Sequence, residues 1–183
     1  MPIRPAAFTI ISLLVASLAY AADAPKGSEA TLEVPQSLKV EYDQLLAHLD
    51  HAIEQHGNAA HLAQAARTAR DLIKAHYDKS IQFVFPPLGL LPALAEGHVT
   101  PDMKAAVVMG ERVKAEHDQL FEENTRITSA LNELMAAAKD QHHQELIAFA
   151  SHAALRSLHE IEVLQPTTIV IGQYVQLRLP ETK

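Results

Sequence analysis

The stretch KAHYDKSIQFVFPP, Lys74 to Pro87, decides the fold, because it carries one face of a helix into a firm stop. Residues three and four apart share a helical face, and the inward positions here keep that spacing. Together with the residues before Lys74, the inward positions of this helix are Leu62, Ala65, Ala69, Leu72, Ile73, His76, Ser80 and Phe83. Since proline cannot continue a helix, Pro86 and Pro87 end it. We therefore expect a helix from about Ala59 to Phe85.

Three more amphipathic helices flank this one. LKVEYDQLLAHLDHAIEQHG, residues 38–57, repeats leucine at the same spacing and stops at Gly57. Thr100 and Pro101 form a helix start, and the helix that follows is expected to reach about Lys139, with Gly110 as a candidate bend. A fourth helix should follow KDQH, residues 139–142, and run to about Gln165. These helices are long enough to form a bundle.

The remaining segments connect and extend the helices. PPLGLLPALAEGHVTPDM, residues 86–103, is apolar but broken by proline and glycine, which predicts a packed irregular crossover with room for one short helical turn. The tail from Pro166 suits either a strand or a helix. We favour a helix that packs Ile169, Ile171, Tyr174 and Leu177. The predicted fold is all-α: an antiparallel up-down four-helix bundle with a long irregular crossover between helices two and three and a C-terminal helical extension.

The N-terminal residues have the pattern of an export signal. A basic Arg4, an apolar run and the Ala19-Tyr20-Ala21 site are typical of a signal peptide, so we expect cleavage after Ala21 and a secreted or periplasmic protein. An uncleaved membrane anchor is the alternative. The expected organisation is a signal peptide at 1–21, a linker at 22–37 and one bundle domain at 38–183.

Composition excludes several classes of function. The formal net charge of -7 argues against nucleic acid or an anionic membrane as partner, and we expect no membrane contact once the signal is removed. With no cysteine, the 183-residue chain has neither disulfide nor thiolate. It also lacks a Gly-rich phosphate loop and a nucleophile elbow.

One level of the predicted bundle gathers polar side chains. Counting outward from hairpins centred near Asn58 and Asp140 places these residues side by side. They are Tyr42, His76, Ser80, Asn124, Arg156 and Glu160. Helical bundles build metal sites from such inward-facing residues on neighbouring helices, so this layer is the candidate site.

At these residues the chain resembles the hemerythrin-like (HHE cation-binding) family of helical bundles. The resemblance runs from about Glu41 to Leu179 and is carried by HYDKSIQFVFPPLGLLPALAEGHVTPDM (76–103) and FASHAALRSLHEIEVLQP (149–166). VEYDQLL (40–46) and EENTRI (122–127) are similar to two further ligand helices. The resemblance implies a four-helix bundle and, in intact members, an iron site.

Most of the ligands that the resemblance implies are replaced. The replaced positions are Tyr42, Leu46, Asn124 and Arg156, where the family has histidine, and Ser80, where it has glutamate. Only His76 and Glu160 keep a ligand type, so the resemblance implies a degenerate metal site. We therefore expect no catalytic or cofactor-binding residue.

The other histidines are interpreted as solvated or partly buried. His117 lies two turns from the Asn124 level, and His159 points away from the side of Glu160. His152 lies one turn before Arg156, and six more lie near helix ends and polar faces: His48, His51, His56, His61, His142 and His143. The QHHQE segment, residues 141–145, is expected to catch copper or zinc only adventitiously.

Arg156 argues against iron in this layer. A guanidinium stays protonated, cannot be a ligand and repels a cation. We hypothesise that Arg156 forms an internal salt bridge with Glu160, four residues later. The alternative is that Arg156 extends outward to solvent.

Two functions follow as expectations. The first is a metal-free, non-enzymatic binding or sensing module for an unknown protein or small molecule, contacted through the crossover or the apolar tail. The second is a single weakly bound iron or zinc on His76 and Glu160, completed by solvent or His152, that handles oxygen, peroxide or nitric oxide.

Overall fold

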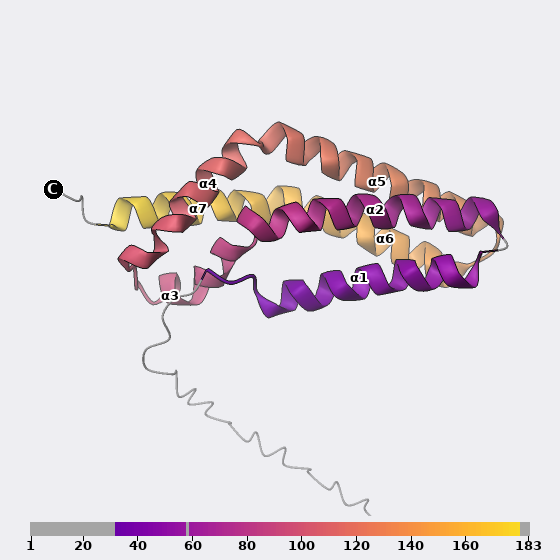
Figure 1. Ribbon diagram of the computed structural model, residues 1–183, viewed down its shortest axis with the longest axis horizontal. Helices are drawn as coiled ribbons and strands as arrows, with labels where there is room; N and C mark the ends of the chain where they lie inside the picture. Colours follow the sequence, from indigo (N-terminus) through magenta and orange to yellow (C-terminus); the bar gives the residue numbers. More distant parts are fainter. Residues whose placement is uncertain (1–31, 58, 180–183) are drawn as a thin grey trace, which may run out of the picture.

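The computed structural model describes residues 32–57 and 59–179, and these residues contain helices and no strand. The predicted all-α bundle is confirmed (Figure 1). The predicted signal peptide at 1–21 lies outside the described residues. Within them, no helix combines the length and the apolar character that a membrane span requires.

The described helices follow one another with short connections. They are α1 (Gln36–Gln55), α2 (Ala60–Phe83), the 3-10 helix η1 (Pro86–Leu90), α3 (Leu91–Ala95), the 3-10 helix η2 (Pro101–Met103), α4 (Lys104–Ala115), α5 (His117–Asp140), α6 (Gln144–His159), the π-helix η3 (Glu160–Leu164) and α7 (Gln165–Arg178).

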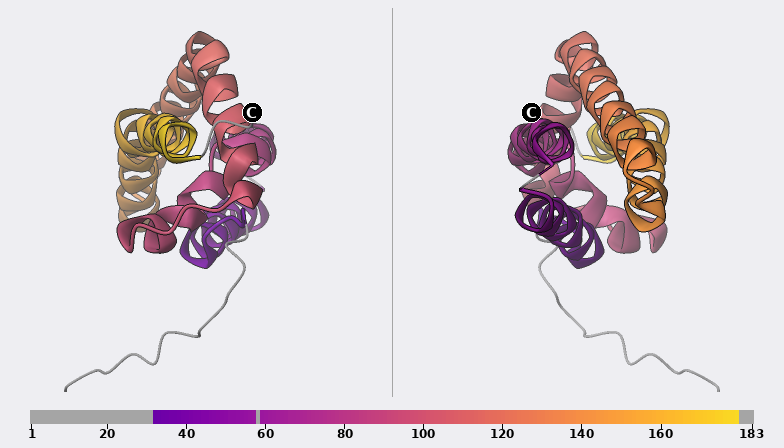
Figure 2. Two further views of the ribbon diagram at one scale, coloured as in Figure 1. Left: turned by 90° about the vertical axis from the view of Figure 1, so that its left-hand side faces the viewer. Right: turned by 90° about the vertical axis from the view of Figure 1, so that its right-hand side faces the viewer.

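Two helical hairpins make the bundle. α1 packs on α2, α5 packs on α6, and α2 joins the hairpins through α5. At the other end of the molecule α4 packs along α7, so the four columns are α1, α2, α4 with α5, and α6 with α7 (Figures 1 and 2). By contrast, the backbones of α1 and α6 approach each other closely at few positions. The core therefore closes tightly on three sides and less tightly between α1 and α6.

The crossover between α2 and α4 contains three short helices, η1, α3 and η2, and is therefore more helical than the predicted irregular segment with one helical turn. α2 ends at Phe83, close to the predicted Phe85, and Pro86 and Pro87 open η1. Leu88 and Leu90 of η1 are buried, whereas α3 has no buried residue. The crossover thus covers one end of the core and leaves α3 at the surface.

The third predicted helix breaks at Glu116, not at Gly110. Glu116 ends α4 with φ -98° and ψ 10°, and the ribbon changes direction there (Figure 1). Gly110 instead lies inside α4 against α7, where a Cβ on it would approach the Thr168 carbonyl oxygen to 3.2 Å and the Gly172 Cα to 3.4 Å. The prediction of a bend at Gly110 was wrong, because this glycine serves close helix contact.

The C-terminal tail is the predicted helix, and it continues α6 through a π-turn. In η3 the Gln165 N–H bonds to the Glu160 carbonyl five residues back. This wider turn precedes Pro166, which has no N–H to give. Of the residues expected to pack, Ile171 is buried, but Leu177 is 83% exposed. Val175 takes the buried position instead, since it lies one helical turn after Ile171.

The end of the predicted linker is part of the packed structure. Leu32 and Val34 pack against the core, and α1 begins at Gln36, two residues before the predicted domain start. Glu33 passes so close to Gly89 of η1 that a Cβ there would meet the Glu33 carbonyl oxygen at 2.3 Å. Only glycine allows the two backbones to approach in this way.

Candidate functional site

The polar layer predicted from the sequence surrounds a small cavity inside the bundle. The cavity has a volume of about 10 Å³, which is room for about one water molecule. Its walls are Tyr42, Leu45, Ile73, His76, Asn124, Ile127, Ala153, Arg156, Ser157 and Glu160. Ser80, one turn after His76, is buried and reaches the same groups. The structure thus brings all six predicted site residues together.

Glu160 is the centre of this layer. It is the first residue of the π-turn η3 and is 2% exposed. Its Oε2 accepts a hydrogen bond from the Tyr42 hydroxyl at 2.5 Å, and its Oε1 accepts one from Ser80 at 3.0 Å. The Nε2 of His76 lies 2.8 Å from the same Oε1. α1 and α2 therefore both supply donors to a single carboxylate from η3.

His76 is held on both sides of its ring. While Nε2 faces Glu160, Nδ1 lies 2.9 Å from Oε2 of Glu123 on α5. Burial by itself would lower the pKa of His76, but the hydrogen bonds and negative charges of Glu160 and Glu123 outweigh burial and raise it. An imidazolium donates from both nitrogens, which matches a carboxylate on each side.

The pKa values of Glu160 and Glu123 shift in the opposite direction to that of His76. Burial raises the pKa of Glu160, but bonds from His76, Tyr42 and Ser80 more than offset burial, and its pKa is lowered. The pKa of Glu123 is also lowered, since Lys79 and His76 outweigh the effect of burial. The lowered pKa values favour ionised carboxylates, and the raised pKa of His76 favours an imidazolium between them.

Sequence reasoning missed Glu123 and Lys79. Lys79 Nζ donates to Glu123 Oε1 at 2.5 Å, and Glu123 is 15% exposed. The network thus alternates in charge from buried Glu160 through His76 and Glu123 to Lys79 near the surface. Both residues adjoin a predicted one, Asn124 and Ser80. Their long side chains reach inward from flanking positions, which an inward stripe alone does not reveal.

The pKa of the Tyr42 hydroxyl is also shifted. Burial first, and then the charge and hydrogen bond of Glu160, raise the pKa of Tyr42 well above its ordinary value. Its ring stacks on Tyr77, with centroids 4.3 Å apart. Tyr42 is therefore a fixed neutral donor to Glu160.

The hypothesis of an Arg156–Glu160 salt bridge was wrong. Arg156 pairs with Glu41 of α1, and its guanidinium carbon lies 4.4 Å from the centroid of the Tyr42 ring. His76, Tyr42 and Ser80 already occupy the Glu160 oxygens, so the guanidinium stays above Tyr42. The outward alternative does not hold either, since the Arg156 side chain is only 14% exposed. Burial lowers the pKa of Arg156, and the charge of Glu160 opposes that effect only in part.

Some polar atoms around the cavity lack a hydrogen-bond partner among the described residues. They include Asn124 Oδ1 and the Nε and Nη2 of Arg156. Asn124 Nδ2 donates to the Leu120 carbonyl oxygen at 3.1 Å and lies 3.2 Å from His76 Nε2. The bond to the Leu120 carbonyl therefore holds the Asn124 side chain to its own helix, and its amide oxygen accepts no hydrogen bond from the described residues.

As a donor set, this layer does not fit the iron site that the resemblance implies for intact members. Glu123 and Glu160 lie on opposite nitrogens of His76, so the three cannot converge on one ion. Arg156 contributes a positive charge in place of a ligand. Within residues 32–57 and 59–179, no three His, Asp or Glu side chains are arranged to hold a metal. His152 is exposed on α6 and does not line the core cavity.

Comparisons with protein-family models, with curated proteins and with solved structures find no match to this chain.

Proposed function

We propose that this chain is an exported helical bundle of the hemerythrin-like type, with a metal-free polar layer in its core, that acts as a binding or sensing module and not as an enzyme. The observation that carries the proposal is the state of His76. Both of its ring nitrogens face carboxylates, at 2.9 and 2.8 Å, and its pKa is raised. A protonated imidazole has no lone pair to offer a metal.

The small size of the core cavity supports a function in which no reaction takes place inside the bundle. A volume of about 10 Å³ has room for about one water molecule and admits no substrate much larger than that. The hollows large enough for a ligand lie on the outside of the bundle, with volumes of about 590 Å³ between α1 and the start of α6 and about 600 Å³ between α5 and α6. We therefore assign ligand binding to the outer surface and a stabilising role to the polar layer.

The test is the metal content of protein purified without chelators, together with its visible spectrum. We expect iron far below one atom per chain, no visible absorption band, and no zinc whose binding depends on His76. Near-stoichiometric iron or zinc that is lost in the His76→Ala variant would overturn the proposal and favour the single-metal alternative on His76 and Glu160. Metal that the His76→Ala variant keeps is bound elsewhere.

A further inference from the structure

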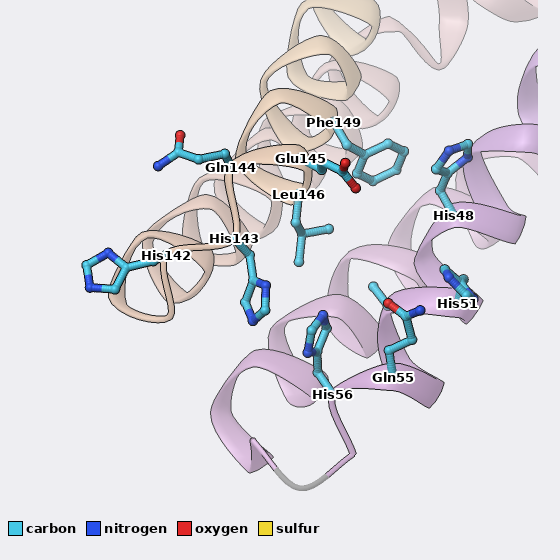
Figure 3. A pocket seen from close by; sticks show the side chains of 11 residues that line it. His48, His51, Gln55, His56, His142, His143, Gln144, Glu145, Leu146 and Phe149 are labelled. Carbon is cyan, nitrogen blue, oxygen red and sulfur yellow. The ribbon is translucent and has the colours of Figure 1, made fainter.

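A histidine-lined cleft, distinct from the core cavity, lies at the hairpin end of the bundle. It has a volume of about 590 Å³ and opens between the C-terminal half of α1 and the start of α6, whose backbones approach closely at few positions (Figure 3). The histidines that line it are His48, His51, His56, His142 and His143. Imidazole is the commonest protein ligand for zinc and copper, so this cleft has the chemistry of a cation site.

Two of these histidines face each other across the cleft. The ring centroids of His56 and His143 are 4.2 Å apart, with the ring planes inclined by 52°. His56 directly follows α1, and His143 directly precedes α6, so the pair joins two helices whose backbones approach closely at few positions. Both side chains are half-buried, which leaves them open to an ion from solvent.

The backbone before α6 sets this arrangement. His142 has φ +59°, a conformation that residues other than glycine adopt rarely. The turn separates the two neighbouring histidines: His142 and His143 point in different directions, and His143 points toward His56 (Figure 3). His143 also makes no side-chain capping bond to α6, so its ring is not committed to the helix end.

The other histidines of the cleft have different contacts. His48 stacks on Phe149 at a centroid distance of 5.2 Å, and its Nδ1 lies 2.9 Å from the Gln44 carbonyl oxygen. Since no group of three ligand side chains in the described part of the chain is ready to hold a metal, a cation here would keep solvent in its remaining positions.

We propose that His56 and His143 form a two-histidine site for a borderline divalent cation, Zn²⁺ or Cu²⁺, which ties the end of α1 to the start of α6. The ring centroids lie 4.2 Å apart, and coordination at the 2.0–2.1 Å of a Zn–N bond requires rotation about the side-chain torsions so that one nitrogen of each ring faces the ion. Cu²⁺ binds more tightly than Zn²⁺, following the usual order for nitrogen ligands. The site is separate from the metal-free layer around Glu160.

The test is a calorimetric titration of the untagged, signal-free chain with ZnCl₂ and CuCl₂ at neutral pH. We expect one tightest site and at least a tenfold loss of its affinity in the His56→Ala/His143→Ala variant. The matched control is His98→Ala/His117→Ala, since both of these histidines are exposed and lie outside the cleft. The control variant should bind like the unmodified chain.

Two further measurements identify the site directly. At zinc concentrations about 100 times Kd, Tm should rise by about 5 to 10 °C, and the rise should vanish in the cleft variant. The electron paramagnetic resonance spectrum of bound Cu²⁺ should show two nitrogen donors. Equal binding by the cleft and control variants would mean adventitious binding only and would overturn the proposal, as would no binding by the unmodified chain. If the alanine variant does not fold, His56→Gln/His143→Gln replaces it with the same expected loss.

Discussion

Glu160 shows at the scale of one residue how a buried charge is kept. Its carboxylate accepts bonds from Tyr42 and Ser80 and lies against His76, so the negative charge is matched and its lone pairs are used. A buried charge without partners would cost several kcal/mol. The pairing therefore makes Glu160 tolerable in the core, and it makes each partner depend on the others.

Replacing Glu160 by glutamine should destabilise the protein by about 3 to 5 kcal/mol, because the substitution leaves the positive charge of His76 unbalanced on that side. Urea unfolding followed by circular dichroism measures the change. The matched control is Glu162→Gln, which alters an exposed glutamate in the same π-turn and should change stability by less than about 0.5 kcal/mol. Equal effects of the two substitutions would contradict the buried network.

At the scale of elements, the packing of α4 on α7 depends on two glycines. A Cβ on Gly172 would approach the Ala106 carbonyl oxygen to 2.9 Å and the Gly110 Cα to 3.3 Å. Both neighbours are backbone and cannot move without shifting a helix. The break at Glu116 lets α4 lean away from the direction of α5 and reach this contact.

Gly172→Ala should therefore destabilise the protein by about 1 to 3 kcal/mol, although alanine is the better helix former. Gly57→Ala is the control, since a Cβ there has nothing nearer than 3.8 Å and should cost much less. Thermal unfolding of the two variants checks the expectation. A Gly172→Ala protein as stable as the unmodified one would mean that α4 and α7 adjust freely.

At the scale of the whole molecule, the polar network couples global stability to pH. Glu160 and Glu123 have lowered pKa values, so their contribution is complete above the unfolded value of about 4.3 and is lost as pH falls through the folded values. His76 has a raised pKa, so its contribution is complete below about 6.5 and is lost as pH rises through the raised value.

Stability should therefore be greatest between about pH 4.5 and 6.5 and should fall on both sides of this range. Urea unfolding at a series of pH values measures the profile. The His76→Gln variant should lose the alkaline decline, whereas the exposed control His117→Gln should keep it. Stability that rises steadily from pH 6 to 9 would contradict a protonated His76 in the folded protein.

The sequence predicted the helices well, because their signals are local. The spacing of apolar residues fixes which face turns inward, and Pro86 ends α2 regardless of what packs around it. Counting from the two hairpins also placed Tyr42, His76 and Glu160 at one level, since helices of known rise keep their register.

The ion pairs of the polar layer could not be predicted from the spacing of residues in the sequence. Glu41 and Glu123 lie next to predicted positions, and whether their side chains reach inward depends on the angle of each helix and on competing donors. Arg156 and Glu160 have ideal helical spacing, yet nearer donors from α1 and α2 occupy Glu160. Spacing along one helix says nothing about such competitors.

The sequence by itself thus determined the helical bundle, the proline-ended crossover and the polar level inside it, because each depends on neighbouring residues in the chain. Only the tertiary structure decided that His76 bridges Glu160 and Glu123, that Arg156 turns to Glu41, and that His56 meets His143. Each of these contacts joins residues far apart in the sequence, and its energy depends on distances that only the packed helices set.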